Sequence, residues 1–490
     1  MPGDGEDFVD PANALLSMRS SSFDELSAYG EVIDNSIQAD ASFVKMKFET
    51  TNNQVRKLIF VDDGEGMDSI TLSKCLSLGY SSRYNDRQGI GRFGVGMKLG
   101  AIHQCKRIEV WSKKSGGEWL YTYLDLDDVE SKTMKKIPSP IKRQPPTEYS
   151  SLIDSEHGTV IVWSKYDNLR KKLMQLQNEL PIWAGRTYRY FMWNKGPNGE
   201  GIPNRSHPLT IYIDGEEIHA LDPLYHNKNR NRFPEDPQST LYDPLTITWP
   251  VDNYGLPSGI QPPEYSDITI RFSILPEEWR QKKGSGGANT TTIPRGITKD
   301  SEGFSILRNY REVWWGTIPY WNQVLGKETK GWSRFDPQDR WWGCEIHFDA
   351  WLDRAFAVKN IKDGAKPLPD LLATIKSNLL PSRNTALETA KNKFSETAKI
   401  ERHDRDKKNS EAEERRMHEE AEMAARNTPS PDHQMRQGVD IEDGLDQFIE
   451  DRSQYQGNEE RARIENLFAT QPFTIEETSW QGSKFFESTH

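Results

Sequence analysis

The first 195 residues alternate between helix-like and strand-like hydrophobic patterns. A stretch of helical length runs from Ser27 to Ala39, and strand-like alternation follows from Phe43 to Glu49. An amphipathic helix is predicted from Leu169 to Leu180, and a Pro/Asn/Gly-rich stretch at 195–206 marks a boundary. Further strands are predicted at Leu58–Val61, Ile108–Ser112, Trp119–Leu126 and Thr159–Ser164. Residues 1–195 are therefore expected to form one α+β domain.

The pattern becomes mixed between residues 207 and 380. Leu209–Ile213 followed by Asp214-Gly215 predicts a hairpin. Strands are predicted at Ile268–Ile274 and Phe304–Arg308, and a helix at Leu368–Leu380. Residues 207–380 are expected to form a second α+β domain.

The C-terminal part of the sequence is strongly charged. Between Glu396 and Arg426 more than half of the residues are charged, and apolar residues are too sparse for a heptad seam. Residues 383–432 are therefore expected to form a solvated helical segment rather than a strong coiled coil. Residues 433–490 are acidic, and their strand-like ending is interpreted as an incomplete module.

Composition narrows the functional class. The chain has 490 residues, a net charge of −11 and three widely spaced cysteines, which argue against a disulfide framework or a zinc cluster. No run approaches the roughly 18 apolar residues of a membrane span, and the acidic N-terminus lacks a secretory pattern. A cytoplasmic protein without a membrane partner is expected. His103, His157 and His347 are interpreted as structural residues.

Basic and aromatic residues admit two interpretations. The basic stretches at 132–143 and 226–232 lie among Pro, Asn and Ser, so they are interpreted as solvated loops, with a phosphate-contacting surface as the alternative. The net negative charge argues against wholesale nucleic-acid binding. Fifteen tryptophans are present, and their apolar contexts indicate core packing rather than base stacking.

The first candidate motif lies on the predicted helix 27–39. Glu31, Asp34 and Asn35 are spaced i, i+3 and i+4, so they are expected to share a face, while Val32 and Ile33 point to the core. A carboxylate can accept a proton from water, and an amide oxygen is a hard ligand for Mg²⁺. Taken alone, the motif is more typical of an ordinary polar helix face.

The second motif is an apolar strand that runs into an acidic turn with two glycines. Asp62 ends the strand, and Gly64, Gly66 and Met67 follow. Glycines allow the backbone to approach a flat ligand, and the carboxylate can accept a hydrogen bond from an exocyclic amine. A tight turn is the alternative, because the twelve-residue pattern of a calcium loop is absent.

The third motif is the glycine-rich run Gly89-Ile-Gly-Arg-Phe-Gly-Val-Gly-Met-Lys98. Its glycines can expose backbone N–H groups to an anion, and the helix predicted after it would favour phosphate at its N-terminus. A dinucleotide-binding site is disfavoured because the glycines do not follow a first strand. A P-loop is disfavoured because Leu99, rather than Ser or Thr, follows Lys98.

In order and spacing, the three motifs together resemble the GHKL superfamily of ATPases, which includes DNA gyrase B subunits, large heat-shock chaperones, histidine kinases and MutL. The resemblance implies a Bergerat fold, a mixed sheet backed by helices, that binds ATP and Mg²⁺ under a glycine-rich lid. It makes Glu31 the general base, Asn35 the Mg²⁺ ligand and Asp62 the acceptor of the adenine amino group. Residues implied beside the base are Gly64, Gly66 and Met67. Residues implied at the phosphates are Gly91, Arg92, Phe93, Gly94, Val95, Gly96 and Lys98.

Within this superfamily the sequence is most similar to the microrchidia (MORC) group. The residues that carry this similarity are Met67, Leu76–Arg83, Gly96–Lys98, His157–Ile161 and Gly303–Arg311. The lid phrase Ile90–Gly96 is also similar to the heat-shock chaperones. The resemblance implies a transducer-like second domain that supplies a further cation to the catalytic site. The candidates are Lys359 and Lys362, where a strand is predicted to run into a loop, and ordinary surface lysines are the favoured alternative.

Three functions remain compatible with this resemblance. The first is a slow, DNA-linked ATPase that dimerises when ATP binds and acts in compaction, repair or defence against foreign DNA. The second is a protein-remodelling chaperone. The third is a nucleotide-sensing interaction module with little turnover.

Overall fold

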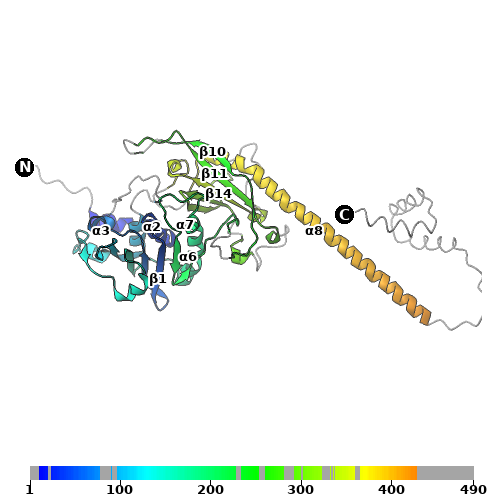
Figure 1. The fold of residues 1–490 in the computed structure, drawn as a ribbon, viewed down its shortest axis with the longest axis horizontal. Coiled ribbons are helices and arrows are strands. Elements are labelled where there is room, and N and C mark those ends of the chain that lie inside the picture. Colours follow the sequence, from blue (N-terminus) through cyan, green and yellow to red (C-terminus); the bar gives the residue numbers. More distant parts are fainter. Residues whose placement is uncertain are drawn as a thin grey trace, which may run out of the picture. The chain divides into compact units, whose positions relative to one another are not determined.

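The computed structural model shows a mixed α+β architecture with two sheets (Figure 1). It describes residues 10–19, 24–77, 90, 96–227, 233–252, 256, 260–280, 292–298, 302–322, 332, 335, 337–358 and 365–426. The predicted α+β class, with a mixed sheet backed by helices, is confirmed.

The first sheet has eight strands in the order β5-β4-β3-β6-β2-β1-β7-β8. Strands β1 and β7 pair in parallel, and the other neighbours are antiparallel. The strands are β1 Phe43–Thr51, β2 Gln54–Asp62, β3 Cys105–Lys113, β4 Leu120–Asp125, β5 Ile141–Lys142, β6 Gly158–Tyr166, β7 Thr210–Ile213 and β8 Glu216–Glu217. The helices around it are α1 Pro11–Met18, α2 Glu25–Gln38, α3 Ser69–Cys75, α4 Gly96–Gln104, α5 Leu126–Glu130, α6 Leu173–Thr187 and α7 Arg189–Trp193.

Strand β2 shows why its sequence is a continuous apolar run rather than an alternating one. Leu58 and Phe60 belong to the main core, which also contains residues of α2, α4 and α6. Ile59 and Val61 belong to a smaller cluster with Trp111 and Tyr149. Because both faces of this strand are covered, every position from Leu58 to Val61 is buried.

Helix α2 lies in the main core and starts at a capped end. The carboxylate of Asp24 accepts a hydrogen bond from the backbone N–H of Ser27 at 2.9 Å. Val32 and Ile33 are buried, as the helical pattern predicts. Helix α4 packs closely against α2, because a Cβ added at Gly100 would lie 2.8 Å from the Cβ of Ala28. This close packing brings the first turn of α4 next to the polar residues of α2.

The hairpin predicted at 209–215 is present as β7 and β8, but it belongs to the first sheet. Phe43 of β1 pairs with Thr210 of β7. The first sheet therefore extends past the boundary expected at 195–206. The parallel pairing buries Ile211 and Ile213, which gives these residues a core that the local pattern does not reveal.

The second sheet has six strands, ordered β10-β11-β14-β12-β13 with β9 paired to β11. Its core is rich in aromatic rings; Trp321 and Trp332 are fully buried, with centroids 4.7 Å apart. Core packing of these tryptophans matches the prediction. The strands are β9 Thr240–Leu241, β10 Leu245–Pro250, β11 Tyr265–Ile274, β12 Phe304–Arg308, β13 Arg311–Gly316 and β14 Trp342–Phe348. Short 3₁₀ helices occur at Thr147–Leu152, Glu277–Trp279, Ile293–Arg295, Pro337–Trp341 and Ala350–Leu352.

Helix α8 is one helix from Pro369 to Arg426, although two segments were expected. Its first turns bury Leu371, Ile375 and Leu379 in the second core, and Pro381 lies inside the helix. The side chains of residues 402–423 are exposed, as the charge pattern predicts. Residues 427–490 lie outside the described residues. No helix in the described part is long and apolar enough to cross a membrane.

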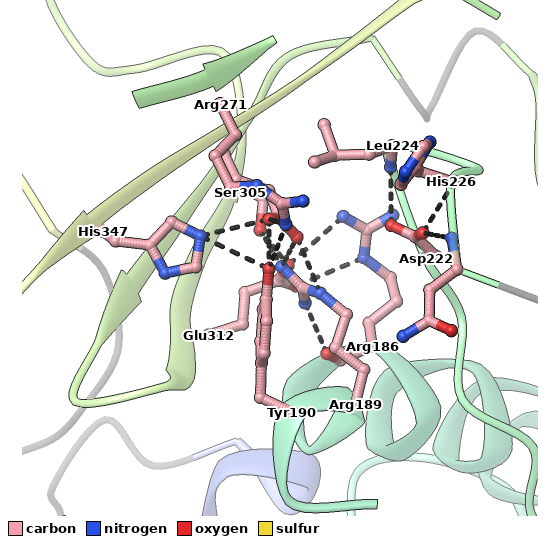
Figure 2. Close-up of polar contacts among 12 residues, drawn as sticks. Arg186, Arg189, Tyr190, Asp222, Leu224, His226, Arg271, Ser305, Glu312 and His347 are labelled. Carbon is pink, nitrogen blue, oxygen red and sulfur yellow. Dashed lines mark hydrogen bonds and ion pairs between the residues drawn. The ribbon is translucent and has the colours of Figure 1, made fainter. Parts of the chain in front are cut away.

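A buried polar network joins α6 and α7 to the second sheet (Figure 2). Arg189 is fully buried and donates hydrogen bonds to Glu345 at 2.7 Å and to Glu312 at 2.8 Å. Arg186 donates to the same Glu312 at 3.2 Å. Three more side chains contact the carboxylate of Glu345, namely Tyr190, Arg271 and His347. We call this set of seven residues the junction network.

Candidate functional site

Glu31 lies on α2 where the first residue of α4 reaches it. Its side chain is buried, with 8 % exposed, and a Cβ added at Gly96 would lie 1.7 Å from Oε2 of Glu31. Only glycine allows the α4 backbone to come this close. The carboxylate therefore lies at the N-terminal end of α4, where a helix favours negative charge.

Asp34 and Asn35 do not share an environment, although the helical spacing predicts a common face. Asp34 is buried and accepts hydrogen bonds from the hydroxyl of Tyr188 at 2.9 Å and from Nε of Arg311 at 2.8 Å. Asn35 is exposed. Asp34 is thus turned toward the second sheet, while Asn35 is accessible to a ligand.

Asp62 is a buried carboxylate whose bonds come from neutral groups. Its Oδ2 accepts a hydrogen bond from the hydroxyl of Ser36 at 2.7 Å, and its Oδ1 accepts the backbone N–H of Gly64 at 3.0 Å. Burial raises the pKa of Asp62 to about 6, against the opposing effect of these hydrogen bonds. Ser36 is on α2, so Asp62 and Glu31 are arranged around one helix.

The adjacent Asp63 has a different role. Its carboxylate accepts the backbone N–H groups of Ser42 at 2.8 Å and Phe43 at 2.9 Å. It therefore anchors the start of β1 instead of facing the site. The sequence motif contains both aspartates, and only the structure shows that they contact different parts of the fold.

The acidic turn after β2 is fixed by close backbone contacts. Gly66 has φ +68°, and a Cβ there would lie 2.1 Å from the carbonyl oxygen of Lys113. The N–H of Met67 donates to the hydroxyl of Ser112 at 2.8 Å. At Gly64 a Cβ would lie 2.7 Å from that of Ala39. These contacts bring the turn close to α2 and to β3.

Several polar residues near this turn were not predicted as part of the site. The ring Nδ1 of His157 is 2.7 Å from the carbonyl oxygen of Gly64. The hydroxyl of Ser112 is 2.9 Å from that of Thr159, which pairs with Asp62 across the sheet. His157 and Thr159 lie in the stretch that carries the microrchidia similarity, which is the one sequence signal that pointed to them.

Lys98 of α4 is buried, and its ammonium donates to the carbonyl oxygen of Ser77 at 2.6 Å. Burial lowers the pKa of Lys98 to about 8. Lys98 lies in the first turn of α4, and the phosphate role implied for it stays a prediction. The other expected phosphate and catalytic residues lie outside the described residues: Gly91, Arg92, Phe93, Gly94, Val95, Lys359 and Lys362.

Asn35 suits a magnesium ion that is bound mainly by nucleotide phosphates. Mg²⁺ in such sites keeps several waters and uses only one or two protein ligands. The exposed amide of Asn35 is a fitting ligand of this kind. Within the described part of the chain, no cluster of three or more His, Cys, Asp or Glu side chains forms an all-protein metal site.

Comparison with known proteins agrees with this geometry. Residues 24–159, which contain α2, Asp62 and α4, match the family of histidine kinase-, DNA gyrase B-, and HSP90-like ATPases. We call residues 24–159 the GHKL domain, because they match this family of ATPases. The predicted superfamily is therefore confirmed for this part of the chain.

The chain is also similar to microrchidia proteins, as predicted. It is 28 % identical to Protein MICRORCHIDIA 3 of Arabidopsis thaliana over 246 residues, which cover 46 % of this chain and 38 % of that protein. It is 29 % identical to MICRORCHIDIA 2 of the same plant over 215 residues, 40 % of this chain and 32 % of the relative. ATPase morc-1 of Caenorhabditis elegans is 34 % identical over 104 residues, 21 % and 12 % of the two chains. The matched region spans less than two fifths of the length of each of these relatives.

Proposed function

We propose that this chain binds Mg·ATP around α2, hydrolyses it slowly and uses the nucleotide to switch between conformations. The GHKL domain supports nucleotide binding, and the name of the relative ATPase morc-1 supports hydrolysis. The observation that carries the proposal is the contact between Glu31 and Gly96, because it brings a carboxylate to the helix end where phosphate is favoured.

Each residue of the site has one role in ATP binding or hydrolysis. The carboxylate of Asp62 accepts the hydrogen bond of the adenine amino group, and its ionised form is the stronger acceptor. Lys98 and the N-terminus of α4 neutralise phosphate charge. Asn35 would hold Mg²⁺, which would neutralise negative charge on the phosphate oxygens. Oε2 of Glu31 orients the attacking water and accepts its proton. A lysine of the second domain, Lys359 or Lys362, completes the phosphate contacts.

Replacing Glu31 by Ala tests this proposal. We expect turnover to fall by roughly 100-fold or more, the usual contribution of a general base. Affinity for a non-hydrolysable ATP analogue should change less than about threefold, because no binding contact is removed. The matched control is Glu118→Ala, whose side chain is 62 % exposed in a surface ion pair. Unchanged turnover in Glu31→Ala contradicts the role of Glu31.

The switch is proposed to work as an ATP-gated homodimer that acts on DNA or on a DNA-associated complex. The likeness to microrchidia proteins supports this assignment above a chaperone or a nucleotide sensor. The test is the oligomeric state with and without a non-hydrolysable analogue, with DNA added in a parallel sample. We expect analogue-dependent dimers and a salt-dependent mobility shift of DNA. Suppression of client aggregation without DNA binding favours the chaperone, and binding without turnover favours the sensor.

A further inference from the structure

The tip of the β12–β13 hairpin carries two buried arginines. Asn309 and Tyr310 form its two-residue turn, with φ values of 45° and 67° that match a type I′ turn. Arg308 and Arg311 flank the turn and pair across the hairpin. Each is 3 % exposed. Both belong to the second sheet, yet both contact the GHKL domain.

Arg311 contacts the turn of α2 that carries Glu31. Its Nε donates to Oδ1 of Asp34 at 2.8 Å, and a Cβ added at Gly30 would lie 3.0 Å from its Nη2. Burial alone would lower the pKa of Arg311, but Asp34, Tyr188 and Glu31 raise it overall, so the guanidinium is charged. A fixed cation of the second sheet therefore lies against the residue that precedes Glu31.

Arg308 fixes the other side of the hairpin. Its Nη2 pairs with Oδ2 of Asp353 at 3.1 Å, and its Nη1 donates to the carbonyl oxygen of Ile90 at 3.0 Å. The side-chain oxygen of Asn309 accepts the backbone N–H of Ala350 at 3.1 Å. The turn is thus anchored to the segment that follows β14, so Arg311 reaches α2 from a rigid support.

The junction network already joins α6 and α7 to the second sheet without Arg308 or Arg311. Arg186 and Arg189 bind Glu312 and Glu345, and no contact of theirs reaches α2 among the bonds of the described residues. Cohesion at this boundary therefore does not require Arg311 to touch α2. The contact with Asp34, three residues from Glu31, calls for a different explanation.

We propose that Arg311 is a positioning residue that sets the place of Glu31 through Asp34. The inference rests on the proposed role of Glu31 as the general base. Asp34 and Glu31 are one helical turn apart, so a displacement of Asp34 moves the base. A misplacement of about 1 Å can reduce turnover by roughly 100-fold. The second sheet thereby controls hydrolysis without touching the nucleotide through this residue.

The test compares Arg311→Gln with Arg311→Lys in the full chain. We expect Arg311→Gln to lower turnover by roughly tenfold or more while the affinity for a non-hydrolysable ATP analogue changes less than about threefold. Lys retains the charge beside Asp34 and should recover part of the turnover. Turnover is normalised to the folded fraction, measured by circular dichroism. Arg186→Gln is the matched control, since it breaks an ion pair at the same boundary; its turnover should stay within about twofold.

A double-variant cycle checks that the effect passes through Asp34. If it does, Asp34→Asn combined with Arg311→Gln loses no more turnover than the worse single variant. Full additivity overturns the inference, and so does an equal loss in Arg186→Gln or a normal rate in Arg311→Gln. These outcomes differ from a failure of the proposed function, in which Glu31→Ala hydrolyses ATP like the unmodified chain or the unmodified chain shows no turnover; the inference then falls together with the proposed function.

Discussion

Two buried carboxylates, Asp62 in the proposed nucleotide site and Glu345 in the junction network, have opposite electrostatic environments. Asp62 is bonded to a hydroxyl and a backbone N–H, and burial raises its pKa to about 6. Burial would also raise the pKa of Glu345, but Arg189, His347 and Arg271 hold it well below its usual range. Neutral donors leave Asp62 short of compensating charge, whereas arginines neutralise Glu345.

This difference separates a site that is suited to a ligand from one that is suited to cohesion. A carboxylate without a cationic partner is stabilised by a further hydrogen-bond donor such as an adenine amino group. A carboxylate that contacts two arginines is stabilised little by another donor. Removal of one of its arginines leaves a buried charge uncompensated. Substitutions in the junction network should therefore affect stability, and substitutions in the nucleotide site should affect affinity and turnover.

The largest effect is expected for Arg189→Met. Removal of the Arg189 guanidinium leaves Glu345 and Glu312 without their shared partner, so the free energy of unfolding should fall by about 3–5 kcal/mol. Urea denaturation followed by circular dichroism measures this loss. The control is Arg354→Met, whose ion pair with Asp252 is half exposed and should contribute less than about 1 kcal/mol. Equal losses of unfolding free energy in Arg189→Met and Arg354→Met would contradict a stabilising role of the junction network.

Asp62→Asn should weaken nucleotide binding with little effect on stability. The amide replaces one acceptor oxygen by a donor, so the affinity for ATP should fall by roughly 10- to 100-fold, the equivalent of about 1–3 kcal/mol. Calorimetric titration with a non-hydrolysable analogue measures it. The neighbouring Asp63→Asn is the control, because Asp63 bonds the start of β1; it should lower stability and leave affinity nearly unchanged. A reversal of these two results removes Asp62 from the adenine site.

Gly96→Ala should lower turnover by displacing Glu31. The added methyl would lie 1.7 Å from Oε2 of Glu31, so the carboxylate must move. We expect a loss of roughly tenfold in turnover at saturating ATP. Gly201→Ala is the control, because a Cβ there meets no atom within 4 Å. Normal turnover in Gly96→Ala would show that the close contact does not set the position of the base.

The smallest effect concerns pH. Because Asp62 has a pKa of about 6, its ionised fraction should halve between pH 7 and pH 6, and ATP affinity should fall by about twofold. Asp62→Asn should lack this pH dependence of ATP affinity. Identical pH profiles of ATP affinity in Asp62→Asn and in the unmodified chain contradict the assignment of Asp62 to the adenine site.

The contribution of Asp62 to stability depends on pH in the opposite direction. Because the folded-state pKa of Asp62 lies above the ordinary 3.8, ionisation of this carboxyl opposes folding. Its contribution to the free energy of unfolding therefore decreases as pH rises from about 4 to about 6.

Much of the GHKL domain could be predicted because its signals are local. The apolar faces of α2 and β1 and the order of the three motifs lie within short stretches, and each reflects a period or a turn that the backbone requires. The membership of β7 could not be predicted, because a strand pattern does not state which edge it joins. The continuity of α8 through Pro381 was also missed, since burial of Ile375 and Leu379 against the second sheet offsets the local preference to break.

The superfamily, the α+β class and the candidate residues Glu31, Asn35 and Asp62 could be predicted from the chain's local motifs, because each motif lies within one helix, turn or loop. Three features depend on long-range packing and could not be predicted: Asp63 anchors β1, Asp34 is buried while Asn35 is exposed, and Arg311 contacts α2. Asp34 and Arg311 are 277 positions apart. Their pairing depends on how a hairpin of the second sheet packs against α2, and no local sequence pattern predicts a contact between residues so far apart in the chain.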